Sequence, residues 1–169
     1  MTVASAAART LAFAVNLEAI AFIWLWAFVN LLSAVLAVSA CLFYVFVYTL
    51  WLKRTSKQNI VIGGADGAVP VLIGWSSVTN SLGWAPVVLF AVIFFWTPPH
   101  FWALAVKYKD DYSAAHVPML PSVASMRETS WQIVAYTVVV LGFSLLFAPV
   151  AGMGAIYVAV AAVTGAVFL

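Results

Sequence analysis

The residues of this chain that could carry acid-base or anion-binding chemistry fall in short polar segments between long apolar ones. Three cations, Lys53, Arg54 and Lys57, are followed closely by Asn59, which we expect to cap a helix. A helix N-terminus flanked by cations is well suited to binding phosphate. The same cations would also fix the topology of a membrane protein, so this pattern leaves both roles open.

A histidine and two carboxylates form a second candidate group. Pro98-Pro99 precedes His100, and because this pair lacks two backbone donors we expect it to kink or break the helix. If the helix is continuous, His100 lies about 16 Å deeper than Asp111 on the same face. The histidine could bond to a neighbouring helix, or bind a ligand or transfer a proton. The adjacent Asp110 and Asp111 could hold Mg²⁺ if other ligands or phosphates complete its shell, or could simply be solvated.

The segment Ile60–Pro70 is rich in small residues, which in a membrane let two helices approach closely. Small side chains would also leave room for a large ligand. Asp66 favours the ligand interpretation, because an ionisable residue at membrane depth is a functional hypothesis by default. Spacings of four, three and four residues define one helix face here, which we expect to point into the bundle. The residues on this face are Asn59, Gly63, Asp66 and Pro70.

The composition indicates that membrane helices position these residues. Hydrophobic residues make up 66% of the 169-residue chain and charged residues 7%, whereas a soluble domain has about 25% charged residues. The net charge of +2, with no basic stripe, argues against a nucleic-acid partner. The single cysteine, Cys41, excludes an internal disulfide and is expected to be a small packing residue.

Six apolar segments predict an all-α, polytopic transmembrane helix bundle, with residues 1–169 forming one domain. A crossing takes about 20 apolar residues, so the first two segments must be joined by a very tight connection at Val29-Asn30. All seven Lys and Arg residues then fall on one side, which orients that side and the N-terminus to the cytoplasm. The segments are Leu11–Phe28, Leu31–Leu52, Ile60–Ser77, Trp84–Val106, Trp131–Phe147 and Val150–Leu169.

Long stretches of the chain match the signature motifs of one known family. The matching stretches are Tyr48–Thr55, Asn59–Gly64, Val69–Trp75, Trp96–Leu104, Asp111-Tyr112 and Val117–Pro121. Together they resemble the protohaem IX farnesyltransferases (haem O synthases), a family of intramembrane aromatic prenyltransferases. The similarity covers most of the chain.

The resemblance implies a ring of nine transmembrane helices and the transfer of a farnesyl group from farnesyl diphosphate to a vinyl group of haem B. Magnesium would hold the diphosphate at the cytoplasmic face of a bacterial plasma membrane. Lys53 and Arg54 would neutralise the departing diphosphate, Asp111 with Asp110 would match an acidic magnesium motif, and His100 would match a histidine of the haem-binding region. The expected substrate-binding residues are Tyr48, Asn59, His100, Lys107 and Tyr112.

Two features depart from this family. The first of its two acidic motifs is absent, so we expect the chain to be incomplete at both ends, to carry six of the nine helices and to be inactive alone. Asp66 stands where a small uncharged residue is expected. Two other functions stay open: a haem-handling membrane protein without transferase activity, and a transporter, although the inverted repeats that would support a transporter are not seen. The sequence does not give the oligomeric state.

Overall fold

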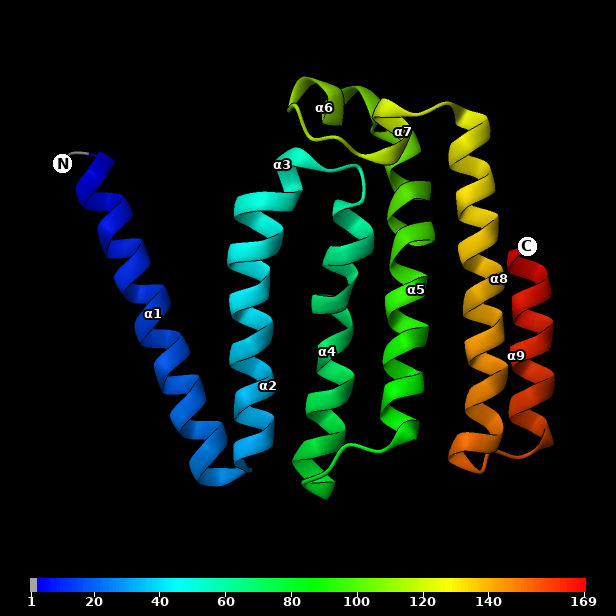
Figure 1. The fold of residues 1–169 in the computed structure, drawn as a ribbon, viewed down its shortest axis with the longest axis horizontal. Helices are drawn as coiled ribbons and strands as arrows, with labels where there is room; N and C mark the ends of the chain where they lie inside the picture. The colour runs from blue at the N-terminus through cyan, green and yellow to red at the C-terminus, as the bar shows by residue number, and fades with distance from the viewer. Residues whose placement is uncertain (1–2) are drawn as a thin grey trace.

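The computed structural model describes the backbone of residues 3–169 and the side chains of residues 8–169, and every regular element in this part of the chain is a helix. The long helices stand side by side in chain order, as Figure 1 shows. The elements are α1 (Val3–Phe28), α2 (Leu31–Leu42), the π-helix η1 (Phe43–Leu52), α3 (Lys53–Thr55), α4 (Asn59–Thr79), α5 (Trp84–Lys107), α6 (Lys109–Ala114), α7 (Leu120–Val123), α8 (Met126–Ala151) and α9 (Ala155–Phe168).

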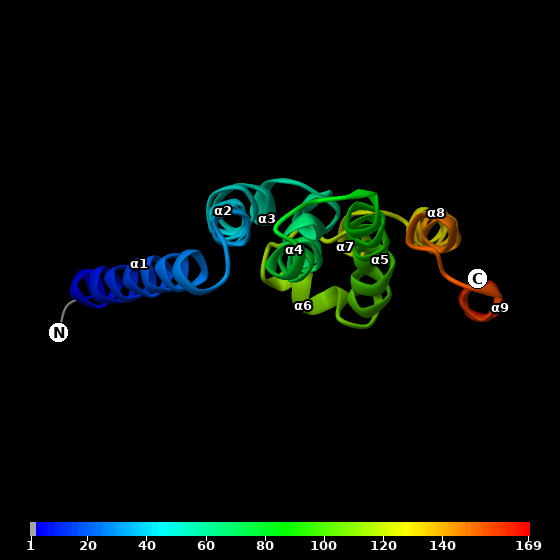
Figure 2. The same ribbon diagram turned by 90° about the horizontal axis from the view of Figure 1, so that it is seen from below.

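The long helices form an open row. Each packs on the next: α1 on α2, α2 on α4, α4 on α5, α5 on α8 and α8 on α9. Figure 2, which views the row along its helices, shows α1 and α9 at opposite ends of it. Within the described residues, α1 and α9 make no contact that would close the row into a ring.

Five of these helices are long and apolar enough to cross a membrane. The sixth predicted crossing corresponds to α9, an apolar helix of 14 residues, which is shorter than the roughly 20 residues that a crossing takes. Large apolar side chains cover the outside of the row; the exposed fraction is 70% for Phe13 in α1 and 83% for Ile156 in α9. Such surfaces are stable in hydrocarbon and not in water, so the chain is an integral, multi-pass membrane protein.

The tight connection predicted at Val29-Asn30 is confirmed. Asn30 caps α2 by accepting a hydrogen bond from the backbone N–H of Ser33 at 2.8 Å, as asparagine does at many helix starts. Its amide also donates to the carbonyl of Ser76 in α4 at 2.7 Å. The fully buried hydroxyls of Ser33 and Ser76 lie 2.7 Å apart. These bonds fasten the α1–α2 turn to the last turns of α4.

The predicted segment Leu31–Leu52 is helical but not uniform. Its second half, η1, is a ten-residue π-helix. A π-helix bonds each N–H to the carbonyl five residues earlier and is rare, occurring mostly as single turns and frequently at functional sites. The segment ends in the short helix α3, which carries Lys53 and Arg54.

The predicted break at Pro98-Pro99 is wrong, because α5 continues through both prolines. Helix α4 packs closely here, since a Cβ added at Gly64 would lie 3.3 Å from the Phe94 carbonyl, which Pro98 cannot bond. The end of α5 at Lys107 agrees with the predicted segment Trp84–Val106 to within one residue, so His100 and Asp111 do not share one continuous helix. The two carboxylates therefore belong to a separate helix, α6.

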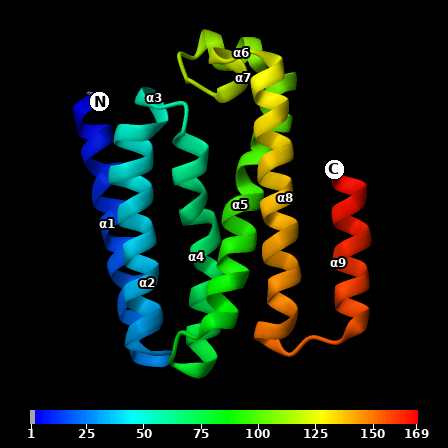
Figure 3. The same ribbon diagram turned by 45° about the vertical axis from the view of Figure 1, so that its right-hand side comes forward.

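Helices α6 and α7 lie across one set of helix ends, next to the start of α4 and the end of α5 (Figures 1 and 3). A small buried cluster of Ile60, Ala105 and Met119 joins them, with Tyr112 and Val117 packed against it. Since burial of apolar side chains stabilises such a contact, the segment between α5 and α8 is held on the helix ends.

Helix α8 begins at a capped N-terminus and extends further than expected. Ser125 accepts a hydrogen bond from the N–H of Glu128 at 3.1 Å, and Glu128 in turn pairs with Lys57 at 3.3 Å. The helix continues through Pro149 and ends at Gly152, whose φ of 66° suits glycine. The connection to α9 therefore lies further along the chain than predicted, between Ala151 and Ala155.

Candidate functional site

Apart from His100, most of the predicted polar residues lie at one set of helix ends, on the side of the row where α1 and α4 begin and α5 ends (Figure 1). Lys53 and Arg54 in α3 and Lys107 at the end of α5 are exposed. Within the described residues, no carboxylate lies at ion-pair distance from any of these three cations. Their charges are thus free to attract an anion, which exposed and already paired cations would do less well.

Asn59 is the first residue of α4 and not its cap, so the capping prediction is wrong. The cap position is Gln58, which makes no capping bond. Asn59 is instead 1% exposed, and its amide nitrogen lies 3.5 Å from the carbonyl of Pro118, in the segment that joins α6 to α7. Its Oδ1 has no partner in the described part of the chain. A buried, unpaired acceptor of this kind costs free energy, which a donor on a ligand or water would recover.

Tyr48 is fixed by a glycine on the neighbouring helix. A Cβ built on Gly63 would lie 2.5 Å from Cδ2 of the Tyr48 ring, so only glycine permits this packing of η1 on α4. Tyr112 packs against the buried cluster that includes Ile60, the residue after Asn59 in α4. Asn59 and Tyr112 therefore lie in one region, and Tyr48 contacts the same helix, α4.

The two adjacent carboxylates begin α6 and are exposed. Asp110 and Asp111 offer the oxygen ligands that Mg²⁺ prefers, and Mg²⁺ usually completes its shell with waters and substrate phosphates. Among the described residues no group of three or more His, Cys, Asp or Glu could hold a metal. The donor set thus fits an ion that is bound together with a phosphate. The ammonium of Lys107 lies 5.6 Å from the ring centroid of Tyr108, close to this pair in the sequence.

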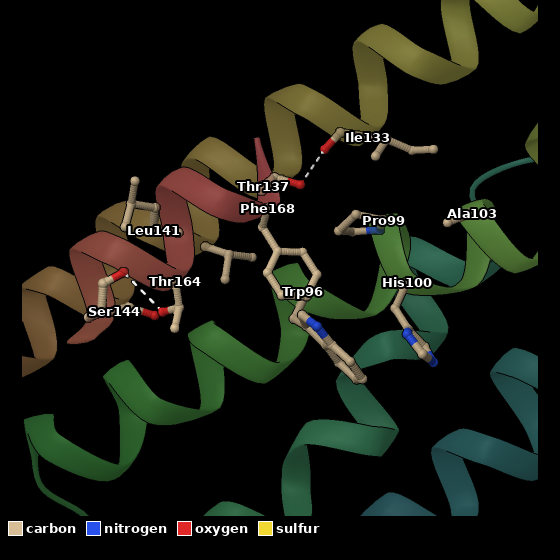
Figure 4. A pocket seen from close by; sticks show the side chains of 13 residues that line it. Trp96, Pro99, His100, Ala103, Ile133, Thr137, Leu141, Ser144, Thr164 and Phe168 are labelled. Carbon is tan, nitrogen blue, oxygen red and sulfur yellow. Dashed lines mark hydrogen bonds between the residues drawn. The ribbon is translucent and has the colours of Figure 1, made fainter. Parts of the chain in front are cut away.

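His100 lies apart from these residues, in an apolar groove of about 440 Å³ between α5, α8 and α9. Figure 4 shows the rings of His100 and Trp96 projecting from α5 next to each other. Their centroids are 4.3 Å apart and their planes differ by 19°, while the ring of Phe101 stands edge-on to His100 at 5.4 Å. Three hydroxyl side chains contribute to the groove: Thr137, Ser144 and Thr164.

Two features of this site were missed by the sequence interpretation, and one prediction about it is partly wrong. The stack of Trp96 on His100 could have been found, because residues four apart on a helix are neighbours. Gly63 was identified only as a small residue, since its contact with Tyr48 depends on how two helices pack. The prediction that the face through Asn59 and Pro70 points into the bundle is wrong for part of it, since Asn59 is buried but Asp66 is partly exposed and Pro70 is exposed.

The described residues form a row of apolar helices with exposed cations and carboxylates at one set of helix ends and an imidazole at an apolar groove, which defines a polytopic helical membrane protein. The chain belongs to the UbiA prenyltransferase family, whose sequence profile matches residues 4–169. It is 55% identical over 162 residues to a protein of Parafrankia sp. named protoheme IX farnesyltransferase. The matching stretch covers 96% of this chain and 52% of that protein.

Two further relatives carry the same name. The protein of Nocardioides sp. is 54% identical over 167 residues, 99% of this chain and 52% of that protein. The protein of Nocardia farcinica is 56% identical over 157 residues, 93% of this chain and 50% of that protein. The chain therefore spans about half the length of the curated relatives it matches. No solved structure matches it.

Proposed function

We propose that this chain provides the diphosphate-binding end and the haem-facing groove of an enzyme that transfers a farnesyl group from farnesyl diphosphate to a vinyl group of haem B, giving haem O. The observation that carries the proposal is the division of the site. Unpaired Lys53 and Arg54 lie at one end of the helices, and His100 lines an apolar groove along them. An anionic diphosphate and a flat, mostly apolar acceptor need these two different surroundings.

The chemistry of the leaving group explains the cations. When the bond between the allylic carbon and the diphosphate oxygen breaks, negative charge grows on the diphosphate. Fixed charges aimed at that oxygen stabilise the transition state more than the ground state. Lys53 and Arg54 supply such charges, and Asn59 and Lys107 lie at the same end. Mg²⁺ held by Asp110 and Asp111 would neutralise further charge on the diphosphate.

The groove along α5 has the character expected for an acceptor that is flat and mostly apolar. Trp96 and His100 present parallel rings, on which an aromatic macrocycle could stack. The imidazole of His100 adds one polar group, able to ligate iron or to bond a carboxylate. We propose the cytoplasm as the side that the cations face, because basic residues favour that side of a membrane.

A chimaera tests this function. The segment of the Nocardioides sp. relative that matches this chain is replaced by the chain itself, and the protein is produced in bacteria that lack their own haem farnesyltransferase. Farnesylated haem in the membranes, detected by mass spectrometry, would support the proposal. Haem that is retained without farnesylation would support a haem-handling protein instead. A chimaera that inserts in the membrane but binds neither haem nor farnesyl diphosphate would contradict both.

A further inference from the structure

Six threonine hydroxyls of the described helices are bonded in the same way, and the hydroxyl of Thr49 is not. Thr49, in the π-helix η1, has a buried Oγ1 without a hydrogen-bond partner in the described part of the chain. Six other threonines each donate to the backbone carbonyl four residues earlier, at 2.7–3.1 Å. They are Thr55, Thr79, Thr97, Thr129, Thr137 and Thr164.

The π-helix accounts for the exception. In an α-helix the carbonyl four residues back lies beside the threonine side chain, which bonds it readily. In a π-helix each turn contains more residues and the backbone bonds run to the fifth residue instead. The carbonyl that a threonine would use is therefore displaced, and the hydroxyl of Thr49 is left without its usual acceptor.

An unpaired hydroxyl inside a membrane protein is unfavourable, because neither lipid nor the apolar interior offers a replacement for water. Two neighbours indicate where its partner comes from. Tyr48, the preceding residue, is pinned against Gly63 of α4, which fixes the orientation of this turn. Lys53 follows Thr49 by four residues, about one helical turn, so the hydroxyl lies one turn from the unpaired cations on the side toward the membrane interior.

We propose that the π-helix Phe43–Leu52 frees the hydroxyl of Thr49 to donate a hydrogen bond to an oxygen of the prenyl diphosphate. This inference rests on the proposed function, since it adds a binding residue to the same anion site. A diphosphate drawn to Lys53 and Arg54 carries acceptor oxygens that meet a donor placed one turn deeper. The hydroxyl would hold the allylic end of the diphosphate, where the bond to carbon breaks.

Three variants of the full chain in lipid nanodiscs separate this role from a structural one. Thr49→Val keeps the shape of the side chain and removes the hydroxyl, whereas Thr49→Ser keeps the hydroxyl. Thr97→Val is the matched control, because Thr97 donates its hydroxyl to the Ile93 carbonyl within its own helix. The dissociation constants of farnesyl diphosphate and of inorganic pyrophosphate, both with Mg²⁺, and the unfolding temperature are measured for each. Anionic lipid is held constant, and then replaced by neutral lipid.

We expect Thr49→Val to weaken binding of both diphosphates by about tenfold, as for the loss of a hydrogen bond to a charged group. Thr49→Ser and Thr97→Val should bind within about threefold of the unchanged chain. We also expect Thr49→Val to unfold at the same temperature or higher, because it removes an unpaired buried hydroxyl. If the effect of Thr49→Val on binding disappears in neutral lipid, the hydroxyl serves a lipid headgroup and the inference is wrong.

The remaining outcomes are separable. Normal diphosphate binding by Thr49→Val overturns the role of Thr49 and leaves the proposed function standing. A lower unfolding temperature for Thr49→Val than for Thr97→Val would show that the hydroxyl has a partner within the protein, which also overturns the inference. Failure of the unchanged chain to bind either diphosphate would overturn the anion site itself, and with it both proposals.

Discussion

The imidazole of His100 lies nearly parallel to the indole of Trp96, with ring centroids 4.3 Å apart. The two residues are four positions apart on α5, so the helix itself produces the stack. The ring of Phe101 also contacts the imidazole, edge to face at 5.4 Å, and the exposed His100 lines an apolar groove. An imidazole held in this way is positioned by its surroundings, which is what ligation or proton transfer requires.

We expect His100→Ala to weaken haem binding by tenfold or more, and to abolish haem O formation by the chimaera, without preventing membrane insertion. His100→Phe is the matched control, because it preserves aromatic stacking and lacks the ring nitrogens. Haem titration followed by absorbance distinguishes the roles: loss of an axial ligand shifts the haem spectrum, whereas loss of a bond to a haem carboxylate lowers affinity alone. Near-normal binding by both variants would leave His100 a packing residue.

The charged side chains of α3 and α6 should act on the diphosphate and not on haem. Asp111→Asn and Lys53→Ala are each expected to cost about 2–4 kcal/mol of transition-state stabilisation, because each charge acts where the leaving group forms. The measurement is turnover of the chimaera against farnesyl diphosphate and Mg²⁺, with haem affinity determined separately. Lys57→Ala is the control, since Lys57 already pairs with Glu128 at 3.3 Å. Equal turnover in all three variants would exclude Asp111 and Lys53 from the mechanism.

Some features of the fold and of the site could be predicted, because each depends on the type and position of a few residues. Asn30 ends one crossing and starts the next because asparagine caps helices, and the sequence shows it at the only interruption between two apolar segments. The gathering of basic residues at one end follows in the same way from their positions between the apolar segments. The cap at α4 was predicted one residue late, at Asn59, which is the usual error at helix ends.

Other features depend on contacts that the sequence does not record. Nothing in Phe43–Leu52 distinguishes a π-helix from an α-helix, since both place apolar side chains in lipid. The sequence predicted the end of α5 but not the short helix α6 that follows it, whose Tyr112 packs on the buried cluster. Pro98-Pro99 was expected to kink or break the helix; α5 is not broken there, because in a membrane protein the packing of neighbouring helices stabilises such a segment.

Two glycines of α4, one turn apart, give a matched test of the contact that orients Tyr48. Gly63→Ala would place a methyl group 2.5 Å from the Tyr48 ring, and the resulting displacement is expected to destabilise the protein by about 1–3 kcal/mol. A Cβ at Gly67 meets nothing within 4 Å, so Gly67→Ala should be neutral or stabilising by up to about 1 kcal/mol, from its higher helix propensity. Thermal unfolding in one detergent compares the two. Equal unfolding temperatures would show that η1 can move away from α4 without cost.

The last prediction concerns the two serines that fasten the α1–α2 turn to α4. Ser76→Ala removes the partner of the Ser33 hydroxyl, which is fully buried, and leaving that hydroxyl unpaired should cost about 1–3 kcal/mol. Ser77→Ala is the control, because the exposed Ser77 hydroxyl bonds only the Gly74 carbonyl of its own helix. The double variant Ser33→Ala with Ser76→Ala should be less destabilised than Ser76→Ala alone, since both members of the pair are then apolar. Unfolding temperatures of the three variants test this order. Finding Ser77→Ala as destabilising as Ser76→Ala would show that the buried pair does not hold the turn in place.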